Sequence, residues 1–526
     1  MSKSLRNIGI VSGATMVSRV LGLVRDMAIA AVFGTSAWAS AFVTAFTLPN
    51  LFRRLLGEGA LTAALIPTLN DELAARQRAG AFALVNQVAS WLTVVTGTIV
   101  GLGMLGLAWV ARHAGAAESV GGPWERWALG AELAVVLFPY LVFVCMAAAL
   151  SAALQTLHRF LEPALSPIWL NMAMIGALGG AVMLGWAEAE DGRMNWLCGG
   201  VLVGGALQVI VPAAALMREG WRPRFDLSLS GPVRSIGRLM GPTVLGSAIY
   251  LINMAVSRLI GLSLNESAAA VLNLASRLME LPIGVFAVAV STVLFPLISK
   301  KAAEGDWAGM TEAYRKGLRL ILVINIPAAV GLVVLAEPIV RLLFQRGAFG
   351  AEDTAQTVPV LAAFAVGLPF FSFVNVVLRA FYAQKDTATP VRGAIWSFVV
   401  NVGLSLALMR PLGTLGLAIA TNVAVVVQAV YLQVRLTRGR GELAFAPVWR
   451  DVVKIVGAAL VMGVVIVAGA RGATGILGSG RWQDAAQLVV LVPLGVVSYG
   501  ALIWWWRVEG RTELVGILQR RFRRGA

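Results

Sequence analysis

The first apolar segment of the sequence carries ionisable side chains whose chemistry suits an anion. Within residues 9–33, Arg19 and Asp26 are spaced so that they share one face of a helix, and Arg25 is turned about 120° from Arg19. Ser18 adds a hydroxyl beside Arg19. A charge at the middle of a membrane helix costs about 2.5–3.5 kcal/mol, so such residues usually face a polar cavity. Arginines kept there indicate a protein that handles an anionic ligand.

A second polar group lies in the next apolar segment, near residues 38–68. Asn50, Arg53, Arg54 and Glu58 crowd one side of the predicted helix. The i,i+4 spacing of Arg54 and Glu58 favours a structural ion pair between them. Arg53 has no acidic residue three or four positions away, so it is the better candidate to bind a ligand.

A third group, Ser276-Arg277-Leu278-Met279-Glu280, lies in an apolar segment near residues 267–298. Arg277 either pairs locally with Glu280 or faces a cavity. Across the three groups the guanidinium groups outnumber the carboxylates. A surplus of positive charge in a cavity of low dielectric constant calls for an anion, and guanidinium matches phosphate oxygens in bidentate geometry. We therefore expect a site for a phosphate or diphosphate.

The composition decides which elements carry these residues. Hydrophobic residues make up 58% of the 526 positions and charged residues 13%, whereas ordinary globular domains carry about 25% charged residues. The apolar stretches are roughly 20 residues long, which is typical of membrane helices and too long for the alternating strands of a membrane β-barrel. The sequence predicts an all-α polytopic membrane protein. About fourteen spans are expected, near residues 8–33, 38–68, 84–111, 128–156, 163–185, 194–217, 236–261, 267–298, 317–344, 356–383, 391–409, 412–434, 452–470 and 484–506.

The formal net charge of +16 is explained by topology rather than by nucleic acid. Roughly 28 of the Lys and Arg residues fall on one side of the predicted spans, about 8 on the other and about 7 within them, which places both termini in the cytoplasm. Attraction to anionic membrane lipids accounts for much of this charge. We expect no nucleic-acid partner.

The sequence gives no indication of an enzyme, a metal site or a cofactor. Cys145 and Cys198 lie in apolar spans and are expected to be buried, inert thiols, and the histidines, His113 and His158, lie near span ends. There is no phosphate-binding Walker loop, so direct ATP hydrolysis is not expected. The protein is predicted to be a transporter.

Internal repeats predict the architecture. Residues 153–163 resemble residues 380–390, with matched Ala and Pro and a following Ile-Trp, at an offset of about 227 residues. Residues 60–67 resemble 289–296 at nearly the same offset. An offset of six spans gives parallel repeats, as in transporters with two rocking lobes. We expect a first six-helix lobe at residues 1–230, a second at 231–445, and two additional helices with a basic cytoplasmic tail at 446–526.

Three runs of sequence carry a resemblance to a known family. Ser18-RVLGLVR-Asp26, Phe46-TLPNLFRRLLGEG-Ala60 and Arg277-LMELPIG-Val285 resemble the MurJ (MviN) family of the multidrug/oligosaccharidyl-lipid/polysaccharide exporter superfamily. These are bacterial flippases of the peptidoglycan precursor lipid II, and the resemblance covers essentially the whole chain. It implies a protein of the bacterial inner membrane that moves lipid II from the cytoplasmic to the periplasmic leaflet by alternating access.

The resemblance also implies roles for residues. By it, the residues that line the cavity and bind the diphosphate head group are Arg19, Arg25, Arg53 and Arg277, with Asn50 and Ser18 beside them. It implies supporting ion pairs among Asp26, Arg54, Glu58 and Glu280. The last two helices are expected to form a groove for the polyprenyl tail. The chain departs from the family at Ser40 and Ser276, where some relatives have acidic residues, so this chain has no carboxylate at these two positions to bind a proton or an ion.

Other functions remain open at this stage. A polysaccharide-lipid flippase or a multidrug/cation antiporter of the same superfamily is the alternative, although an antiporter for organic cations would be expected to present acidic cavity residues. An anion channel also uses arginine rings. The expected partners are lipid II, membrane lipids and other cell-wall synthesis proteins. The polar residues of the spans near 391–434 (Asn401, Ser405, Thr421 and Asn422) are neutral, so the sequence does not indicate the energy source.

Overall fold

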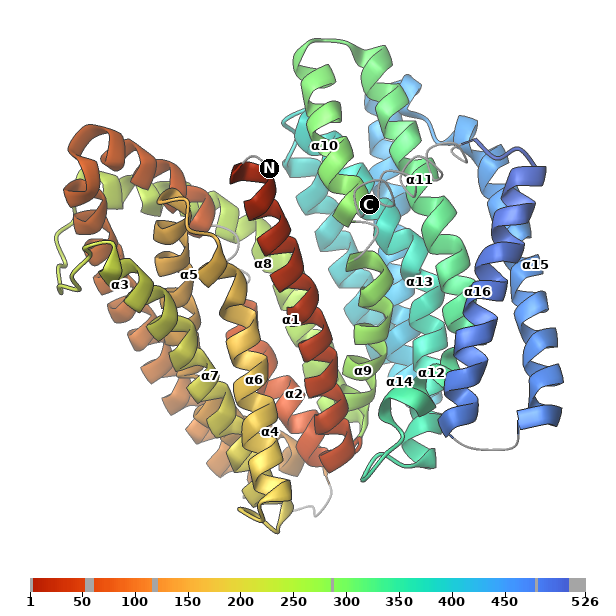
Figure 1. Ribbon diagram of the computed structural model, residues 1–526, viewed down its shortest axis with the longest axis horizontal. Coiled ribbons are helices and arrows are strands. Elements are labelled where there is room, and N and C mark those ends of the chain that lie inside the picture. The colour runs from red at the N-terminus through yellow and green to blue at the C-terminus, as the bar shows by residue number, and fades with distance from the viewer. Residues whose placement is uncertain (1–2, 53–60, 116–121, 285–287, 478–480, 510–526) are drawn as a thin grey trace. The chain divides into compact units, whose positions relative to one another are not determined.

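The structure is a computed structural model that describes residues 3–52, 61–115, 122–284, 288–477 and 481–509. These residues are mainly helical (Figure 1). The helices are α1 (Lys3–Phe33), α2 (Ala37–Phe52), α3 (Leu61–Gly115), α4 (Pro123–Leu137), α5 (Tyr140–Thr156), α6 (Leu161–Met183), α7 (Glu190–Arg218), α8 (Gly231–Leu264), α9 (Ala268–Pro282), α10 (Val288–Ala303), α11 (Trp307–Val334), α12 (Ala336–Phe344), α13 (Ala351–Ala383), α14 (Ala388–Gly439), the short 3₁₀ helix η3 (Gly441–Leu443), α15 (Ala446–Leu477) and α16 (Arg481–Trp505).

Each predicted span coincides with one helix, part of a long helix or two consecutive helices, which confirms the all-α membrane fold. The described residues include eight helices that are long and apolar enough to cross a membrane, and α4 with α5, bent by 42°, forms a ninth candidate. The long helix α3 is interrupted at Arg76 and Gln77, and α14 is interrupted at Gly413, where φ is 57°. The interruption at Gly413 separates the spans predicted near 391–409 and 412–434.

The chain falls into two units. The first comprises residues 1–270 with 346–348, and the second comprises 271–345 with 349–526. Helix α8 therefore packs with the first unit, although the repeat pattern predicts that the second lobe begins at residue 231. That predicted boundary concerns the order of the repeats along the chain, and it stays a prediction.

The turn between α5 and α6 recurs between α13 and α14, where residues 153–163 and 380–390 resemble each other in sequence. His158 and Lys385 both have a φ of 61°, a left-handed conformation that side chains other than glycine seldom adopt. At each turn the following amide donates to the carbonyl oxygen five residues earlier, at 2.9 Å in one and 3.0 Å in the other. This is the Schellman arrangement that ends a helix. Pro163 and Pro390 follow in the first turn of the next helix.

Close packing of α6 against α7 fixes the position of α6 in the first unit. A Cβ atom added at Gly204 would lie 2.8 Å from the Cα of Leu170, and one at Gly200 would lie 3.0 Å from the carbonyl oxygen of Ala173. Only glycine allows the two backbones to approach this closely, which is the usual way that membrane helices pack. The approach holds in place the turn of α6 that carries Asn171.

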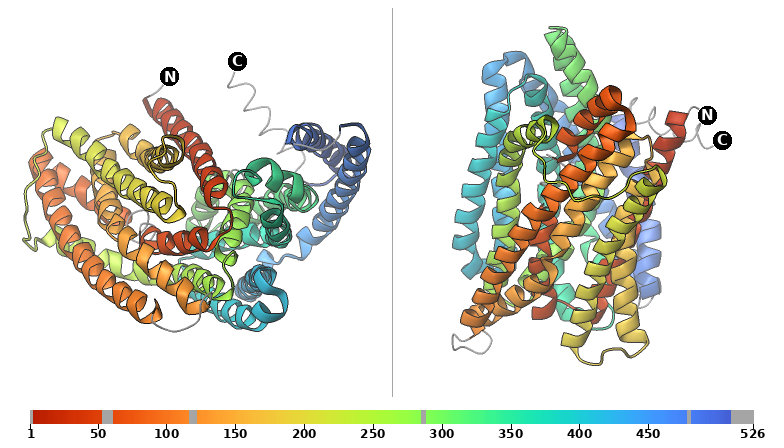
Figure 2. Two further views of the ribbon diagram at one scale, coloured as in Figure 1. Left: turned by 90° about the horizontal axis from the view of Figure 1, so that it is seen from below. Right: turned by 90° about the vertical axis from the view of Figure 1, so that its left-hand side faces the viewer.

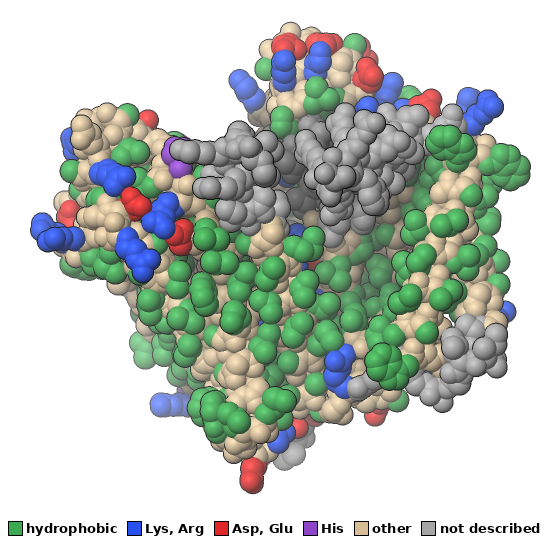
Figure 3. Space-filling model, viewed as in Figure 1, with side chains coloured by type: hydrophobic (Ala, Val, Ile, Leu, Met, Phe, Trp, Pro, Cys, Tyr) green, Lys and Arg blue, Asp and Glu red, His purple; other side chains and the backbone are tan. Residues whose placement is uncertain are grey.

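Helices α15 and α16 pack side by side within the second unit (Figure 2). The Nε of Arg319 on α11 lies 2.9 Å from Asp451 on α15, and the Nη2 of Arg341 on α12 lies 3.2 Å from Asp484 on α16. The hydroxyl of Tyr499 donates to the carbonyl oxygen of Val323 at 2.7 Å. Apolar side chains cover the middle of the helices on the face drawn in Figure 3, as expected of surfaces in contact with lipid.

Candidate functional site

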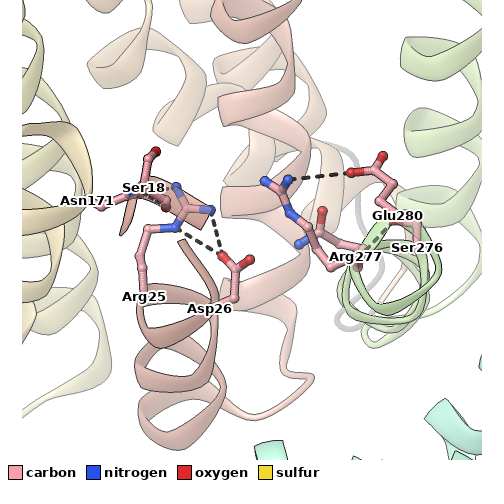
Figure 4. Close-up of polar contacts among 8 residues, drawn as sticks. Ser18, Arg25, Asp26, Asn171, Ser276, Arg277 and Glu280 are labelled. Atoms are coloured by element: carbon pink, nitrogen blue, oxygen red, sulfur yellow. Dashed lines mark hydrogen bonds and ion pairs between the residues drawn. The ribbon is translucent and has the colours of Figure 1, made fainter. Parts of the chain in front are cut away.

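Arg25 on α1 is the centre of a buried polar cluster in the first unit (Figure 4). Its Nη2 and Nε both donate to Oδ1 of Asp26, at 2.7 and 3.0 Å, and its Nη1 donates to Oδ1 of Asn171 on α6 at 3.0 Å. Only 8% of Arg25 and 6% of Asp26 is exposed. Because a buried charge needs both an opposite charge and hydrogen bonds, this arrangement lets an arginine remain charged within an apolar helix.

The pairing differs from the one that helical spacing suggests. Arg19 and Asp26 share a face by periodicity, and adjacent residues on a helix do not face each other. The long side chain of Arg25 nevertheless reaches back to its neighbour, and Asp26 binds Arg25. Arg19 is half-buried and forms no hydrogen bond or ion pair with any residue that the structure describes. Of the two arginines, Arg19 is therefore the one whose guanidinium is available to an anion.

Asn171 is the residue of this cluster that sequence reasoning missed. It is buried, its Oδ1 accepts from Arg25, and its Nδ2 donates to the carbonyl oxygen of Ser18 at 3.2 Å. The cluster thus uses the backbone of Ser18, while we expected its hydroxyl to contribute. The signal in the sequence was a single asparagine in the apolar span near 163–185, but its partner lies 146 positions away in the chain.

Arg277 on α9 of the second unit forms an ion pair with Glu280, with 3.6 Å between Nη1 and Oε2. The two side chains are 38% and 43% exposed, and an ion pair this open contributes only about 0–1 kcal/mol. This ion pair therefore holds the guanidinium only weakly. The hydroxyl of Ser276 donates to the carbonyl oxygen of Asn273 at 2.9 Å, so it is used within its own helix.

The remaining predicted residues of the site lie at or beyond the end of α2. Asn50 is half-buried in the last turn of that helix, one residue after Pro49. Arg53, Arg54 and Glu58 lie outside the described residues. The predicted Arg54–Glu58 ion pair and the predicted ligand role of Arg53 therefore stay predictions.

Ser40, which departs from the family pattern, has a structural role in the first unit. Its hydroxyl oxygen accepts a hydrogen bond from the backbone amide of Ala270 at 3.2 Å, and Ser40 is fully buried. Ala270 lies in the first turn of α9, where amides have no partner within the helix. The serine therefore helps to cap α9. Among the described residues, no group of three or more His, Cys, Asp or Glu could hold a metal ion.

A long apolar cavity of about 960 Å³ lies in the second unit. Its walls come from α11, α13, α14 and α15, and include Val366, Val430, Leu460 and Val464, which are 57–68% exposed. Within the described residues, α16 contributes no side chain to this lining. The cavity thus borders α15 and not α16, and the tail groove predicted for the last two helices stays a prediction.

Comparisons with known proteins identify the family of the chain. The sequence profile of the family described as "Lipid II flippase MurJ" matches residues 29–479. The chain belongs to the lipid II flippase MurJ family. A probable lipid II flippase MurJ of Rhizobium tropici is 35% identical over 505 residues, which cover 92% of this chain and 91% of that protein. A probable lipid II flippase MurJ of Vibrio cholerae serotype O1 is 32% identical, with 96% of each chain covered.

Solved structures give the same assignment for the fold. A structure described as "Lipid II flippase MurJ, inward closed conformation" matches with a TM-score of 0.75 and 25% identity, over 94% of this chain and 98% of that one. An inward-facing multidrug resistance transporter of the MATE family shares the fold with a TM-score of 0.64 at 17% identity. Members of the MurJ family are named as flippases, so the chain is a membrane transporter and not an enzyme.

Proposed function

We propose that the protein is a flippase that moves lipid II from the cytoplasmic to the periplasmic leaflet of the bacterial inner membrane. The observation that carries the proposal is the match to the MurJ family along residues 29–479. The separate locations of charged and apolar surfaces in the structure support it. Guanidinium groups lie in membrane helices, and an apolar groove lies along α15. This division suits a substrate with an anionic head and a long hydrocarbon tail.

The head group is held by arginines. Arg19, Arg25, Arg53 and Arg277 bind the diphosphate, with Asn50 and Ser18 beside them. The roles of the two arginines on α1 differ, because Arg25 is neutralised by Asp26. Arg19 supplies net positive charge to the ligand, and Arg25 keeps two N–H groups beyond those bonded to Asp26 and Asn171. Asn171 orients Arg25 and holds the backbone of α1 at Ser18.

The polyprenyl tail remains in the apolar groove while the head group crosses. Moving each CH₂ group of such a tail into water costs about 0.8 kcal/mol of free energy. The tail therefore stays in contact with hydrocarbon. The groove of about 960 Å³ presents almost only apolar side chains, with Gln433 and Arg471 as the polar residues of its lining. The protein thereby moves the head group through a polar path and leaves the tail in an apolar one.

Transport proceeds by alternating access, with both termini of the chain in the cytoplasm. The cavity opens inward, binds the head group, closes and opens outward. Other cell-wall synthesis proteins are the expected partners, because they make and consume the substrate. A flippase for polysaccharide-linked lipids is the second candidate, and the family assignment favours lipid II over it.

A binding comparison tests the proposal. The purified protein is titrated with lipid II and, in parallel, with a polysaccharide repeat on the same polyprenyl diphosphate. We expect tighter binding of lipid II, and we expect the wild-type chain, but not the Arg19→Ala variant, to restore growth of a flippase-depleted bacterium. Equal binding of both lipids, together with failure to restore growth, would refute the assignment of lipid II.

A further inference from the structure

The segment between α7 and α8 is an extended strap that crosses the end of the first unit. Residues 221–230 have no regular secondary structure, and they join the last residue of α7, Arg218, to the first of α8, Gly231. The strap is the yellow-green trace beside the helices at the left of Figure 1. Because it connects two membrane helices at their ends, it lies at the depth where the bilayer meets water.

Alternate residues of the strap are bonded to the part of α3 that follows the interruption at Gln77. The amide of Asp226 donates to Oγ of Ser90 at 2.9 Å. Gln87 donates through Nε2 to Oδ2 of Asp226 at 3.1 Å and to Oγ of Ser228 at 2.8 Å, and its Oε1 accepts from Oγ of Ser230 at 2.6 Å. The side chains of Asp226, Ser228 and Ser230 are thus directed toward α3.

Asn86 fixes the beginning of the strap in the same way. Its Nδ2 donates to the carbonyl oxygen of Arg222 at 3.1 Å, and its Oδ1 accepts from the amide of Arg224 at 3.2 Å and from Nε1 of Trp221 at 2.9 Å. Trp221 is buried beneath it. Side chains of α3 therefore fix the backbone of the strap and determine which of its residues face this helix.

This register directs three large apolar side chains away from the protein. In an extended chain successive side chains point to opposite sides. Phe225, Leu227 and Leu229 alternate with the bonded residues, and they are 70%, 40% and 52% exposed. A single exposed apolar residue is ordinary, but three held outward in one row form a surface that water solvates poorly.

The strap and the helix ends that flank it also carry exposed cations. Arg218, Arg222, Arg224, Arg234 and Arg238 are all exposed. The two acidic residues nearby are already engaged, since Glu219 binds Arg78 and Arg159, and Asp226 accepts from Gln87 and from the amide of Ser228. The strap therefore combines an outward apolar edge with net positive charge, a combination that suits an anionic lipid surface.

We propose that the strap at residues 222–229 is a membrane-surface anchor. Phe225, Leu227 and Leu229 insert into the boundary between head groups and acyl chains, and Arg222 and Arg224 bind the phosphates of anionic phospholipids. The occupant of this surface is the bilayer itself. The anchor does not depend on which lipid the protein transports, and it fixes in the leaflet the connection between the two predicted repeats.

Site-directed nitroxide labels test the anchor in the full chain. In a variant with Cys145→Ala and Cys198→Ala, a single cysteine replaces Phe225, Leu227 or Leu229, and Glu304, exposed in the turn before α11, serves as the aqueous control position. The labelled proteins are placed in phosphatidylcholine bilayers with and without phosphatidylglycerol. Collisions with oxygen report contact with lipid, and collisions with a water-soluble nickel chelate report contact with water.

We expect the three strap labels to collide often with oxygen and rarely with the nickel chelate, with the reverse at position 304. Adding phosphatidylglycerol should move the labels on the strap deeper into the bilayer. In the Arg222→Gln/Arg224→Gln variant the depth of the labels should no longer respond to phosphatidylglycerol. Strap labels as open to nickel as the control would overturn the anchor, and labels shielded from both reagents would show a protein contact instead. Depth independent of phosphatidylglycerol would overturn the role of the arginines.

Discussion

Variants that remove Arg25, Asp26 or both should distinguish the contribution of this ion pair to stability from its contribution to transport. Arg25→Ala leaves a buried carboxylate and Asp26→Ala leaves a buried guanidinium, in a place where the side chains are only 10% and 8% exposed. Removing both leaves no charge behind. The three variants form a double-mutant cycle whose coupling energy measures the pair directly.

The magnitude follows from the burial. Breaking a buried ion pair by removing one partner costs about 3–5 kcal/mol, whereas replacing both is often neutral. Asp26→Ala retains the hydrogen bond from Nη1 to Asn171, so its cost should fall at the lower end of this range. We expect each single variant to lose about 3 kcal/mol and the double variant to recover most of that loss, because no uncompensated charge remains.

The chain contains its own probes for the measurement. Cys145 and Cys198 are free and fully buried in helices of the same unit. A thiol-reactive dye that fluoresces on reaction therefore reports unfolding of that unit when the detergent-solubilised protein is heated. Growth of a flippase-depleted bacterium reports transport by the same variants.

The expected pattern is a low melting temperature for each single variant, a restored one for the double variant, and no transport by the double variant. Unchanged melting in Asp26→Ala would refute the claim that Arg25 depends on this carboxylate. Full transport by the double variant would refute the claim that Arg25 also serves the substrate. Asn171→Leu provides a third variant, which should lower transport more than it lowers melting if Asn171 mainly orients Arg25.

Three further predictions concern other parts of the molecule. Arg19→Lys and Arg277→Lys should each lower transport at least about tenfold at unchanged protein level, because a lysine loses bidentate phosphate geometry; wild-type transport by both would contradict it. Val464→Trp, in the apolar groove, should weaken transport of a long-tailed lipid more than binding of a short-chain analogue, and equal effects on both would contradict it. Hydrogen bonds from the Lys301 ammonium and from the backbone amide of Gly309 hold the pKa of the Asp306 carboxyl below its ordinary value. A lowered pKa stabilises the folded turn above the unfolded value and loses that effect as pH falls through the folded value. The protection of the α10–α11 turn against hydrogen exchange, relative to the intrinsic rate at each pH, should therefore fall in acid below about pH 4, and Asp306→Asn should remove this loss of protection.

The sequence by itself determined the class of protein and the location of its helices. A bilayer requires every span to satisfy its backbone internally and to be apolar over about 20 residues, so composition and hydropathy identify the spans. The resemblance of two turns was also visible in the sequence, because a helix-ending turn is a local structure. The residues around His158 and Lys385 repeat at one offset and form the same turn. The charged positions on α1 and α9 were identifiable for a similar reason, since a charge within an apolar run is conspicuous.

Only the tertiary structure decided which groups these charges meet. Helical periodicity placed Asp26 on the face of Arg19, but the long side chain of Arg25 reaches Asp26 and pairs with it. The packing of α6 against α7 fixes the turn of α6 that carries Asn171, the second partner of Arg25. The apolar groove has walls from four helices, and the strap depends on amide side chains of α3 that lie about 140 positions away in the chain. Such partners are chosen by the packing of whole helices, to which each residue contributes a small part, so local sequence pattern does not specify them.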